Sequence, residues 1–377
     1  MRIAVVDTYY ARFLSAHYAS QRQLKHQSYS VQLDSLVSSA FGTSDFYSRH
    51  LNEMGCETID LIVNGIQLQS AWARENGVSF NPLALKLPHR LFRLPFVGHR
   101  LALLPGLMDI ALAQIRAYRP DVLYCQDLSF FPADILTQLK RHVGLIVGQI
   151  ACPLPPEEFL KGYDLILTSF PHFVDRIRKL GVASEYFRIG FDTRVLELIG
   201  GGGKDVGASF VGGVSRHHDK AMPLLEHLAV NTPIQFFGYG AKTLPRSSPI
   251  RRRHNGEVWG VNMYRALARS RVTLNRHINV AENYANNMRL YEATGVGALL
   301  ITDHKENLGE LFEVGKEVVA YSSKEEAAEM IRYYLAHPQE AEVIAKAGQA
   351  RTLRDHTYRR RMEELVPILQ RHLGGTR

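Results

Sequence analysis

Cysteine is scarce in this 377-residue sequence, and long hydrophobic runs are missing. The three cysteines, Cys56, Cys125 and Cys152, are widely spaced and form no Cys-x-x-Cys pair, which argues against a disulfide framework or a structural zinc site. No apolar run reaches the roughly 18 residues that a membrane-spanning helix needs, and the apolar stretch at residues 3–6 is too short for a signal-peptide core. We therefore expect a reduced, cytoplasmic protein.

Several catalytic signatures are also missing. The chain has no His-Glu-x-x-His, no Gly-x-Ser-x-Gly, and no Gly-x-Gly-x-x-Gly after its first predicted strand. It has no Asp-x-Asp, so the clamp with which one large class of sugar transferases holds a metal ion and a diphosphate is absent. The run His217-His218-Asp219 could ligate a metal, but adjacent histidines in a strand-end loop usually face solvent. We predict no metal site.

Four consecutive glycines, Gly200 to Gly203, precede Lys204 and superficially resemble a phosphate-binding loop. The template fails twice, because its first glycine would fall on Leu198 and Asp205 stands where Ser or Thr is required. A flexible connection between two domains fits this composition better. We therefore predict one domain at residues 1–200 and a second at 201–377.

Positive charge is in excess: the net charge is +8. Nucleic acid, an acidic membrane surface and phosphorylated small molecules are all partners that suit such a charge. The one dense basic run, at 251–254, follows loop-like residues and is interpreted as a solvated loop, so we predict no nucleic-acid binding.

Residues 89–115 are apolar but carry Arg90, Arg93 and Arg100. Such a segment can lie on an anionic membrane surface or accept a lipid-linked substrate. The commoner alternative for such a segment is to pack on its own domain with the arginine heads reaching water. Peripheral membrane contact through 89–115 is kept as one of these two possibilities.

Short apolar runs alternate with helical patterns along the whole chain, which predicts an α/β protein with parallel sheets. In the first half the expected strands lie at 3–6, 58–63, 122–125, 145–150 and 165–169. In the second half they lie at 208–214, 232–240, about 272–275 and 317–321. We predict two Rossmann-like domains that face one another across a cleft, followed by C-terminal helices.

Glycines stand at strand ends in the second half, where parallel sheets bind ligands. Gly212 and Gly213 follow one strand, and Gly238 and Tyr239 follow the next. Without a Cβ atom, glycine lets backbone N–H groups approach a phosphate closely. Nearby, Arg289 and Glu292 share a helix face, where they would bind a diphosphate and ribose hydroxyls, or simply form an i,i+3 surface ion pair.

The stretch Asn287-x-Arg289-x-x-Glu292-Ala-x-Gly295-x-Gly297 and its following strand resemble the nucleotide-binding signature of GT-B glycosyltransferases. The similarity is greatest to the bacterial CgeB-like, or spore-maturation-protein-like, group of the group 1 glycosyltransferases, and it extends over roughly residues 208–370.

This resemblance implies a GT-B architecture in which Glu292 binds the donor ribose and Arg289 or Arg216 the diphosphate, bordered by Gly213 and Tyr239. Retaining members of the wider class often carry a glutamate seven residues before the ribose-binding one, where this chain has Ala285. The stereochemical outcome is left open.

An inverting transfer needs a base from the first domain to deprotonate the acceptor hydroxyl. Asp127, just after the predicted strand 122–125, and Asp45, at the start of a predicted helix, are the candidates. Both could instead cap helices.

We expect a metal-independent, hexosyltransferase-like enzyme with a nucleotide sugar as donor substrate and no separate cofactor. The acceptor, whether glycan, protein or lipid-linked, is not identified. A catalytically idle nucleotide-sugar-binding partner protein and a sugar-nucleotide epimerase of the same fold are the alternatives.

Overall fold

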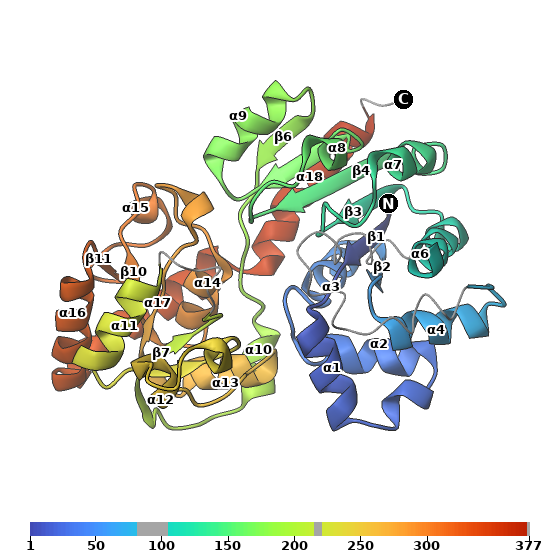
Figure 1. Ribbon diagram of the computed structural model, residues 1–377. Helices are drawn as coiled ribbons and strands as arrows, with labels where there is room; N and C mark the ends of the chain where they lie inside the picture. Colours follow the sequence, from blue (N-terminus) through green and yellow to red (C-terminus); the bar gives the residue numbers. More distant parts are fainter. Residues whose placement is uncertain (81–104, 215–220, 375–377) are drawn as a thin grey trace. The chain divides into compact units, whose positions relative to one another are not determined.

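The computed structural model describes residues 1–80, 105–214 and 221–374, and the chain divides into two compact units (Figure 1). Met1–Phe187 and Met362–Arg377 form the first unit, and Arg188–Arg361 form the second. The sequence predicts the division after residue 200. In the structure, the glycine run 200–203 lies inside the second unit, directly ahead of that unit's first strand.

The first unit contains a six-stranded parallel sheet with strand order β2-β1-β3-β4-β5-β6. The strands are β1 (Arg2–Asp7), β2 (Glu57–Ile62), β3 (Val122–Cys125), β4 (Leu145–Ile150), β5 (Leu165–Thr168) and β6 (Ala183–Tyr186). β3, β4 and β5 are buried along their whole length, because a parallel sheet covered on both faces requires unbroken apolar runs. That burial explains why the sequence located these three strands to within one residue.

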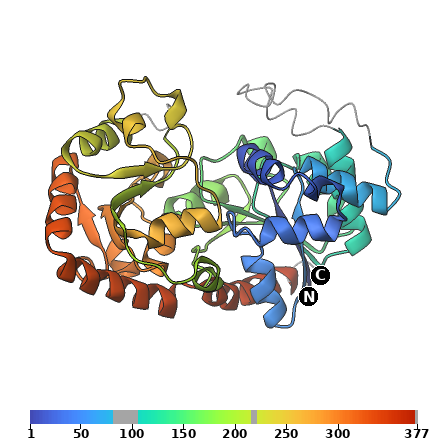
Figure 2. The same cartoon turned by 90° about the horizontal axis from the view of Figure 1, so that it is seen from below.

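Helices surround this sheet (Figures 1 and 2). They are α1 (Ala11–Ser20), α2 (Tyr29–Val37), α3 (Phe46–Glu53), α4 (Ile66–Glu75), α6 (Pro105–Tyr118), α7 (Ala133–Leu139), α8 (Glu157–Leu160) and α9 (Pro171–Lys179), with a 3-10 turn at Leu24–His26. The last helix, α18 (Tyr358–Gly374), belongs to this unit from Met362 onward. There Arg371 and His372 bind Glu185 of β6 at 2.8 and 2.6 Å.

The segment 89–115 is described only from Pro105, where α6 begins; residues 89–104 lie outside the described residues. Within α6, Leu107, Ile110 and Ile115 are buried, so this part packs on its own unit. No helix in the described ranges is long and apolar enough to cross a membrane.

The second unit contains a five-stranded parallel sheet with order β11-β10-β9-β7-β8. Its strands are β7 (Val206–Val211), β8 (Gln235–Phe237), β9 (Ser270–Leu274), β10 (Leu299–Asp303) and β11 (Val319–Tyr321). Its helices are α10 (Arg194–Ile199), α11 (Met222–Asn231), α12 (Pro249–Arg252), α13 (Val261–Ala268), α14 (Met288–Gly295), α15 (Leu308–Leu311), α16 (Lys324–Ala336) and α17 (Pro338–Asp355), with 3-10 turns at Ala241–Thr243 and Asn279–Ala281. A shared core of Leu225, Phe236, Val272, Ile301 and Ile331 joins α11 and α16 to the strands. The predicted α/β class with two parallel sheets is confirmed.

The basic run 251–254 is exposed to solvent at Arg252 and Arg253, as its composition suggested, but it is not simply a loop, because α12 extends over Pro249–Arg252. Arg251 lies in α12 and donates to the Leu244 carbonyl at 2.7 Å, while Arg253 donates to the Thr232 carbonyl at 2.8 Å. His254 lies 2.7 Å from the Gly238 carbonyl. These side chains satisfy backbone carbonyls at loop ends, a role that long cationic side chains fill well and that composition alone does not reveal.

Candidate functional site

The strand orders identify where each sheet should bind a ligand. In an open parallel sheet, ligands bind outside the carboxyl ends of the strands, at the topological switch point. There the chain continues from one strand to neighbours on both of its sides. In the second unit this point lies between β7 and β9, because β8 follows on one side of β7 and β9 on the other. In the first unit it lies between β1 and β3, because β2 and β3 flank β1.

Asn275 lies directly after β9, at the second unit's switch point, and forms hydrogen bonds that fix the start of α14 there. Its side-chain oxygen accepts a hydrogen bond from the Asn287 amide at 3.0 Å, and its own amide donates to Thr302 at 2.9 Å. Asn287 is the N-cap of α14 and accepts from the backbone N–H of Leu290 at 3.1 Å. Predicted donor-binding residue Asn287 therefore holds the helix start at the carboxyl end of β9.

Arg289 and Glu292 form an ion pair on α14, with Nη1 and Oε2 2.8 Å apart. The pairing is that of the i,i+3 alternative, but it is not a surface contact: the two side chains are only 17% and 6% exposed. The Tyr264 hydroxyl lies 3.4 Å from the second Glu292 oxygen, and Arg289 also contacts the Met263 sulfur at 2.7 Å. An i,i+3 pair on a helix surface contributes only about 0.2–0.5 kcal/mol to stability. Stability alone therefore gives little reason to hold both charges in this mostly buried position.

The predicted glycines lie at the ends of β7 and β8 and pack against each other. A Cβ atom on Gly213 would lie 2.5 Å from the Tyr239 ring, and one on Gly238 would lie 2.3 Å from the Gly212 carbonyl oxygen. Gly238 also has a φ of +115°, which side chains other than glycine rarely adopt. The Tyr239 ring in turn stacks on Trp259, with centroids 5.5 Å apart. Arg216, the second diphosphate candidate, lies outside the described residues.

Two glycines at the end of α14 explain its sharp return to the sheet. Gly295 lies against the Phe191 ring, where a Cβ atom would approach to 2.6 Å, and Gly297 has a φ of +77°. The Lys204 ammonium and the Gln349 amide donate to the carbonyls of Gly297 and Gly295, which ends the helix. The two glycines of the Ala-Thr-Gly-Val-Gly pattern thus serve two purposes. Gly295 allows α14 to approach Phe191 closely, and Gly297 adopts the left-handed backbone conformation of the turn that follows.

Replacing Gly295 with alanine is expected to destabilise the second unit by about 1–3 kcal/mol, because the added methyl collides with the fully buried Phe191. Urea denaturation followed by circular dichroism measures the loss. Gly309→Ala in α15 is the matched control: nothing lies within 4 Å of its Cβ position, so it should leave stability unchanged or slightly raised. Equal stability of the Gly295→Ala and Gly309→Ala proteins would refute this packing argument.

His277 and Asp303 form a buried dyad that the sequence reasoning missed. The His277 Nδ1 atom and backbone N–H lie 2.7 and 3.0 Å from Asp303 Oδ1, and Lys305 lies 3.4 Å from the other oxygen. Burial tends to raise the pKa of Asp303, but the His277 hydrogen bonds and the nearby cations together lower it. The His277 Nε2 atom is buried without a hydrogen-bond partner among the described residues. An orphaned nitrogen at the carboxyl end of β9 suits contact with a ligand oxygen.

At the first unit's switch point, β1 and β3 bring two carboxylates together. Asp7 ends β1, and Asp127 follows β3 by two residues. The Thr8 hydroxyl donates to Asp127 Oδ2 at 2.7 Å, and the Ser129 N–H donates to Oδ1 at 2.9 Å. The structure therefore places the predicted base Asp127 beside Asp7, which the sequence reasoning did not single out. The sequence signal that could have identified Asp7 is that it is a carboxylate at the end of the first predicted strand.

Asp7 titrates near neutrality. Burial raises its pKa to about 7, the Thr8 N–H opposes the rise, and the charge of Asp127 adds to it. A carboxyl group of this pKa is suited to general-base work near pH 7. Asp45, the other predicted base, sits at the start of α3 without capping it through its side chain, and its charge contributes to the raised pKa of Asp60.

Asp60 of β2 is a second carboxyl group whose pKa burial raises to about 7, against a hydrogen bond of 2.5 Å from Ser48. Because its ordinary pKa is about 4, the folded state binds more protons than the unfolded state between about pH 4 and 7. Asp60 therefore stabilises the protein less as pH rises through this window.

Asp60→Asn should raise the free energy of unfolding by about 2 kcal/mol at pH 8 and leave it nearly unchanged at pH 4, since a tenfold change in acidity corresponds to about 1.4 kcal/mol and partial solvent contact reduces the effect. Denaturant titrations of both proteins across this pH range provide the measurement. The exposed Asp34→Asn serves as control. A gain that does not depend on pH would contradict the assignment.

No three His, Cys, Asp or Glu side chains gather as around a metal ion within residues 1–80, 105–214 and 221–374. The run 217–219 lies outside those ranges. Metal-independent transfer stays a prediction.

Solved structures similar over the whole chain now bear on this arrangement. HepE from Anabaena, in complex with UDP-glucose, is 12% identical with a TM-score of 0.59, covering 98% of this chain and 99% of that one. Sucrose-phosphate synthase from Thermosynechococcus elongatus is 11% identical with a TM-score of 0.57 and full coverage of both chains. AviGT4, a glycosyltransferase of avilamycin A biosynthesis, is 15% identical with a TM-score of 0.55, covering 100% and 98%. The fold is GT-B.

Residues 217–367 of this GT-B chain match a family model described as glycosyl transferase-like. The match includes Asn287, Arg289 and Glu292 but not the first unit's Asp7 and Asp127. A comparison with curated proteins finds no match. The match covers most of the second unit, Arg188–Arg361, including the residues that the structure gathers around α14.

Proposed function

We propose that the protein is a glycosyltransferase that moves a hexose from a nucleoside diphosphate to an acceptor hydroxyl, and that it is a CgeB-like member of the group 1 glycosyltransferases. The observation that carries this proposal is the buried Arg289–Glu292 pair on a helix capped at the carboxyl end of β9, within the glycosyl transferase-like match. The UDP-glucose complex of the GT-B protein HepE supports a nucleotide sugar as donor and makes UDP-glucose the first donor to test.

The donor's groups can be assigned by charge. Glu292 accepts hydrogen bonds from the ribose hydroxyls, and Arg289, held against it, offers its remaining guanidinium donors to the diphosphate. The Gly213 backbone N–H, together with the Nε2–H of a protonated His277, stabilises the charge that grows on the leaving diphosphate. This set needs no metal ion.

The first unit supplies the base in this proposal. Asp127 takes the proton of the acceptor hydroxyl as that oxygen attacks the anomeric carbon, and the nucleoside diphosphate leaves with the electrons of the broken bond. Thr8 and the Ser129 N–H orient the carboxylate, leaving lone pairs on both oxygens. Asp7 is the competing candidate because its pKa of about 7 suits the same task.

Incubating the protein with UDP-glucose and other nucleotide sugars, with and without glycan, lipid-linked and protein acceptors, tests the proposal. Release of nucleoside diphosphate that requires an acceptor, together with the acceptor gaining the mass of one sugar, is the expected result. Release without any acceptor would favour a sugar-nucleotide epimerase. Binding without turnover would favour a catalytically idle nucleotide-sugar-binding partner.

A further inference from the structure

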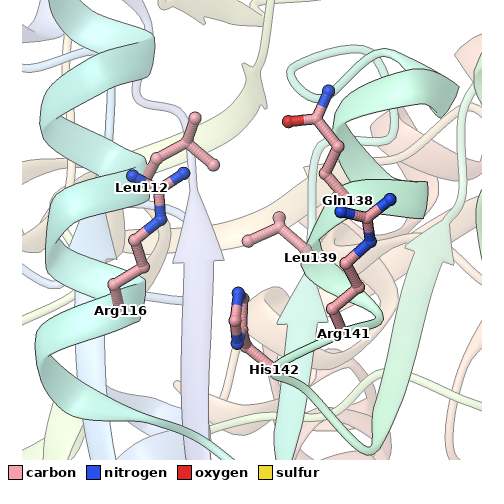
Figure 3. A pocket seen from close by; sticks show the side chains of 6 residues that line it. All are labelled: Leu112, Arg116, Gln138, Leu139, Arg141 and His142. Atoms are coloured by element: carbon pink, nitrogen blue, oxygen red, sulfur yellow. The ribbon is translucent and has the colours of Figure 1, made fainter.

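A cationic pocket lies at the opposite edge of the first sheet from Asp7 and Asp127. It has a volume of about 320 Å³ and is lined by Leu112, Arg116, Gln138, Leu139, Arg141 and His142 (Figure 3). The lining residues come from the last turns of α6 and α7 and the two residues that lead toward β4. Because α6 and α7 end just before the starts of β3 and β4, the pocket lies at the amino ends of these strands. The proposed transfer site is at the carboxyl edge.

Two arginines line the pocket without an acidic side chain to pair with them among the described residues. Figure 3 shows the guanidinium groups of Arg116 and Arg141 on either side of the pocket, with the His142 ring between them. Within the described part of the chain, no acidic side chain pairs with either arginine, and none lines the pocket. The neighbouring cations differ: Lys140 pairs with Asp164 at 2.6 Å and Arg2 with Glu57 at 3.1 Å.

The ends of α6 and α7 offset only part of this charge. A helix C-terminus carries roughly half an elementary negative charge, so two of them compensate about one of the two guanidinium charges. At least one positive charge therefore remains, in a concave site where field lines concentrate. Two planar guanidinium groups at such a site match the oxygens of a phosphate, which they can bind in pairs of parallel hydrogen bonds.

We propose that this pocket binds the phosphate group of a phosphorylated organic molecule, through Arg116 and Arg141 with His142 and Gln138 as further donors. The pocket is larger than a bare phosphate needs, since its volume corresponds to on the order of ten water molecules. Leu112 and Leu139 are buried beneath its polar rim and provide apolar contact for the organic part. This proposal does not depend on the proposed sugar transfer.

The phosphate can come from a free metabolite or from a lipid headgroup, and both supply the same chemistry. The first wall of the pocket is α6, which begins inside the segment 89–115 and packs on its own unit through Leu107, Ile110 and Ile115. A membrane surface near this segment is the reason to test a lipid headgroup as well as a free phosphate. Two arms of one experiment separate the sources. Calorimetric titration with inorganic phosphate and glycerol 3-phosphate tests the free group, and flotation with phosphatidylcholine vesicles, with or without phosphatidylglycerol, tests the headgroup.

The double variant Arg116→Gln plus Arg141→Gln should lose at least about tenfold in affinity in whichever arm shows binding, because it removes the charge-assisted hydrogen bonds of both guanidinium groups. Arg22→Gln plus Lys25→Gln, which removes the same charge from exposed positions of the same unit, should bind like the wild type. Arg116→Lys plus Arg141→Lys keeps the charge but not the paired donors, and should lie between the two.

Circular dichroism and melting curves establish that all variants are folded, which is expected because both arginines are exposed. Loss of binding in the glutamine pair with retention in the control supports the pocket, and the responding arm names the phosphate source. Equal loss in the control would show that net charge alone is responsible and would overturn the proposal. Absence of binding in both arms would overturn it as well.

Discussion

Asp127→Asn is expected to lower turnover by about 10²- to 10⁴-fold while leaving the affinity for the donor unchanged. The reason is that a positioned general base contributes rate enhancement of this size, whereas the donor is bound by the second unit. Asparagine retains one oxygen to accept from the Ser129 N–H, and its amide can donate to the Thr8 hydroxyl oxygen, so the local structure should persist. Steady-state kinetics with a functional acceptor, combined with donor titrations, measures the two effects separately.

Asp45→Asn and Asp7→Asn complete this test. Asp45→Asn should leave turnover within a few-fold of the wild type, because in this proposal the carboxylate that takes the proton is the one that Thr8 and Ser129 orient, Asp127. Asp7 should be protonated below its pKa of about 7. If Asp7 is the base, activity must rise as pH passes through 7, and Asp7→Asn rather than Asp127→Asn must abolish it. Unchanged turnover in Asp127→Asn would remove that residue from the mechanism.

Glu292→Gln should weaken nucleoside diphosphate binding by roughly 10- to 150-fold. A hydrogen bond to a charged group contributes about 1.5–3 kcal/mol, and the amide also removes the charge that holds Arg289 in place. Calorimetric titration measures the affinity. The exposed Glu310→Gln on α15 of the same unit is the matched control and should bind like the wild type.

Breaking a buried ion pair can also destabilise the fold by about 3–5 kcal/mol, so a second variant separates stability from binding. Arg289→Met plus Glu292→Leu removes both charges and should be about as stable as the wild type, yet bind no nucleoside diphosphate. If this double variant binds as well as the wild type, the pair has only a structural role and Glu292 does not contact ribose.

The sequence predicts those features that depend on residues close together in the chain, such as buried strands, strand ends and the residues of one helix face. The runs VLYC and LIVGQI coincide with β3 and β4, because strands buried on both faces are apolar throughout. The glycines after β7 and β8 likewise mark strand ends, because the close packing of Gly213 on Tyr239 and the φ of Gly238 permit no side chain. Asn287, Arg289 and Glu292 share one helix, so their spacing already places them together.

Features that depend on strand order or distant contacts were not predicted. Asp7 and Asp127 are separated by most of the first unit's sequence and become neighbours only because β1 pairs with β3. His277 meets Asp303 in the same way, across β9 and β10. Gly295 is required by Phe191, over one hundred positions earlier, which no local pattern indicates.

Composition was a poor guide to structure where the same residue type can have two structural roles, as glycine and arginine do here. The glycine run 200–203 was interpreted as a boundary between domains, yet the compact units divide at Phe187 and Arg188, and Met362–Arg377 lies with the first unit. Glycine-rich sequence indicates a connection but not which elements it connects. Similarly, the arginines at 251–253 suggested a solvated loop. Arg252 and Arg253 are exposed, but all three arginines donate to backbone carbonyls.

The central claim is that the carboxyl edge of the second sheet binds a nucleoside diphosphate. Calorimetric titration of the wild-type chain with UDP, GDP, TDP, CDP and ADP tests it most directly. We predict that at least one of them binds. When its concentration is about 100 times its dissociation constant, this nucleotide should also raise the free energy of unfolding by about 2.7 kcal/mol, which a melting curve measures. If the folded protein binds none of the five, the assignment of Arg289 and Glu292 to a nucleotide-sugar donor is wrong.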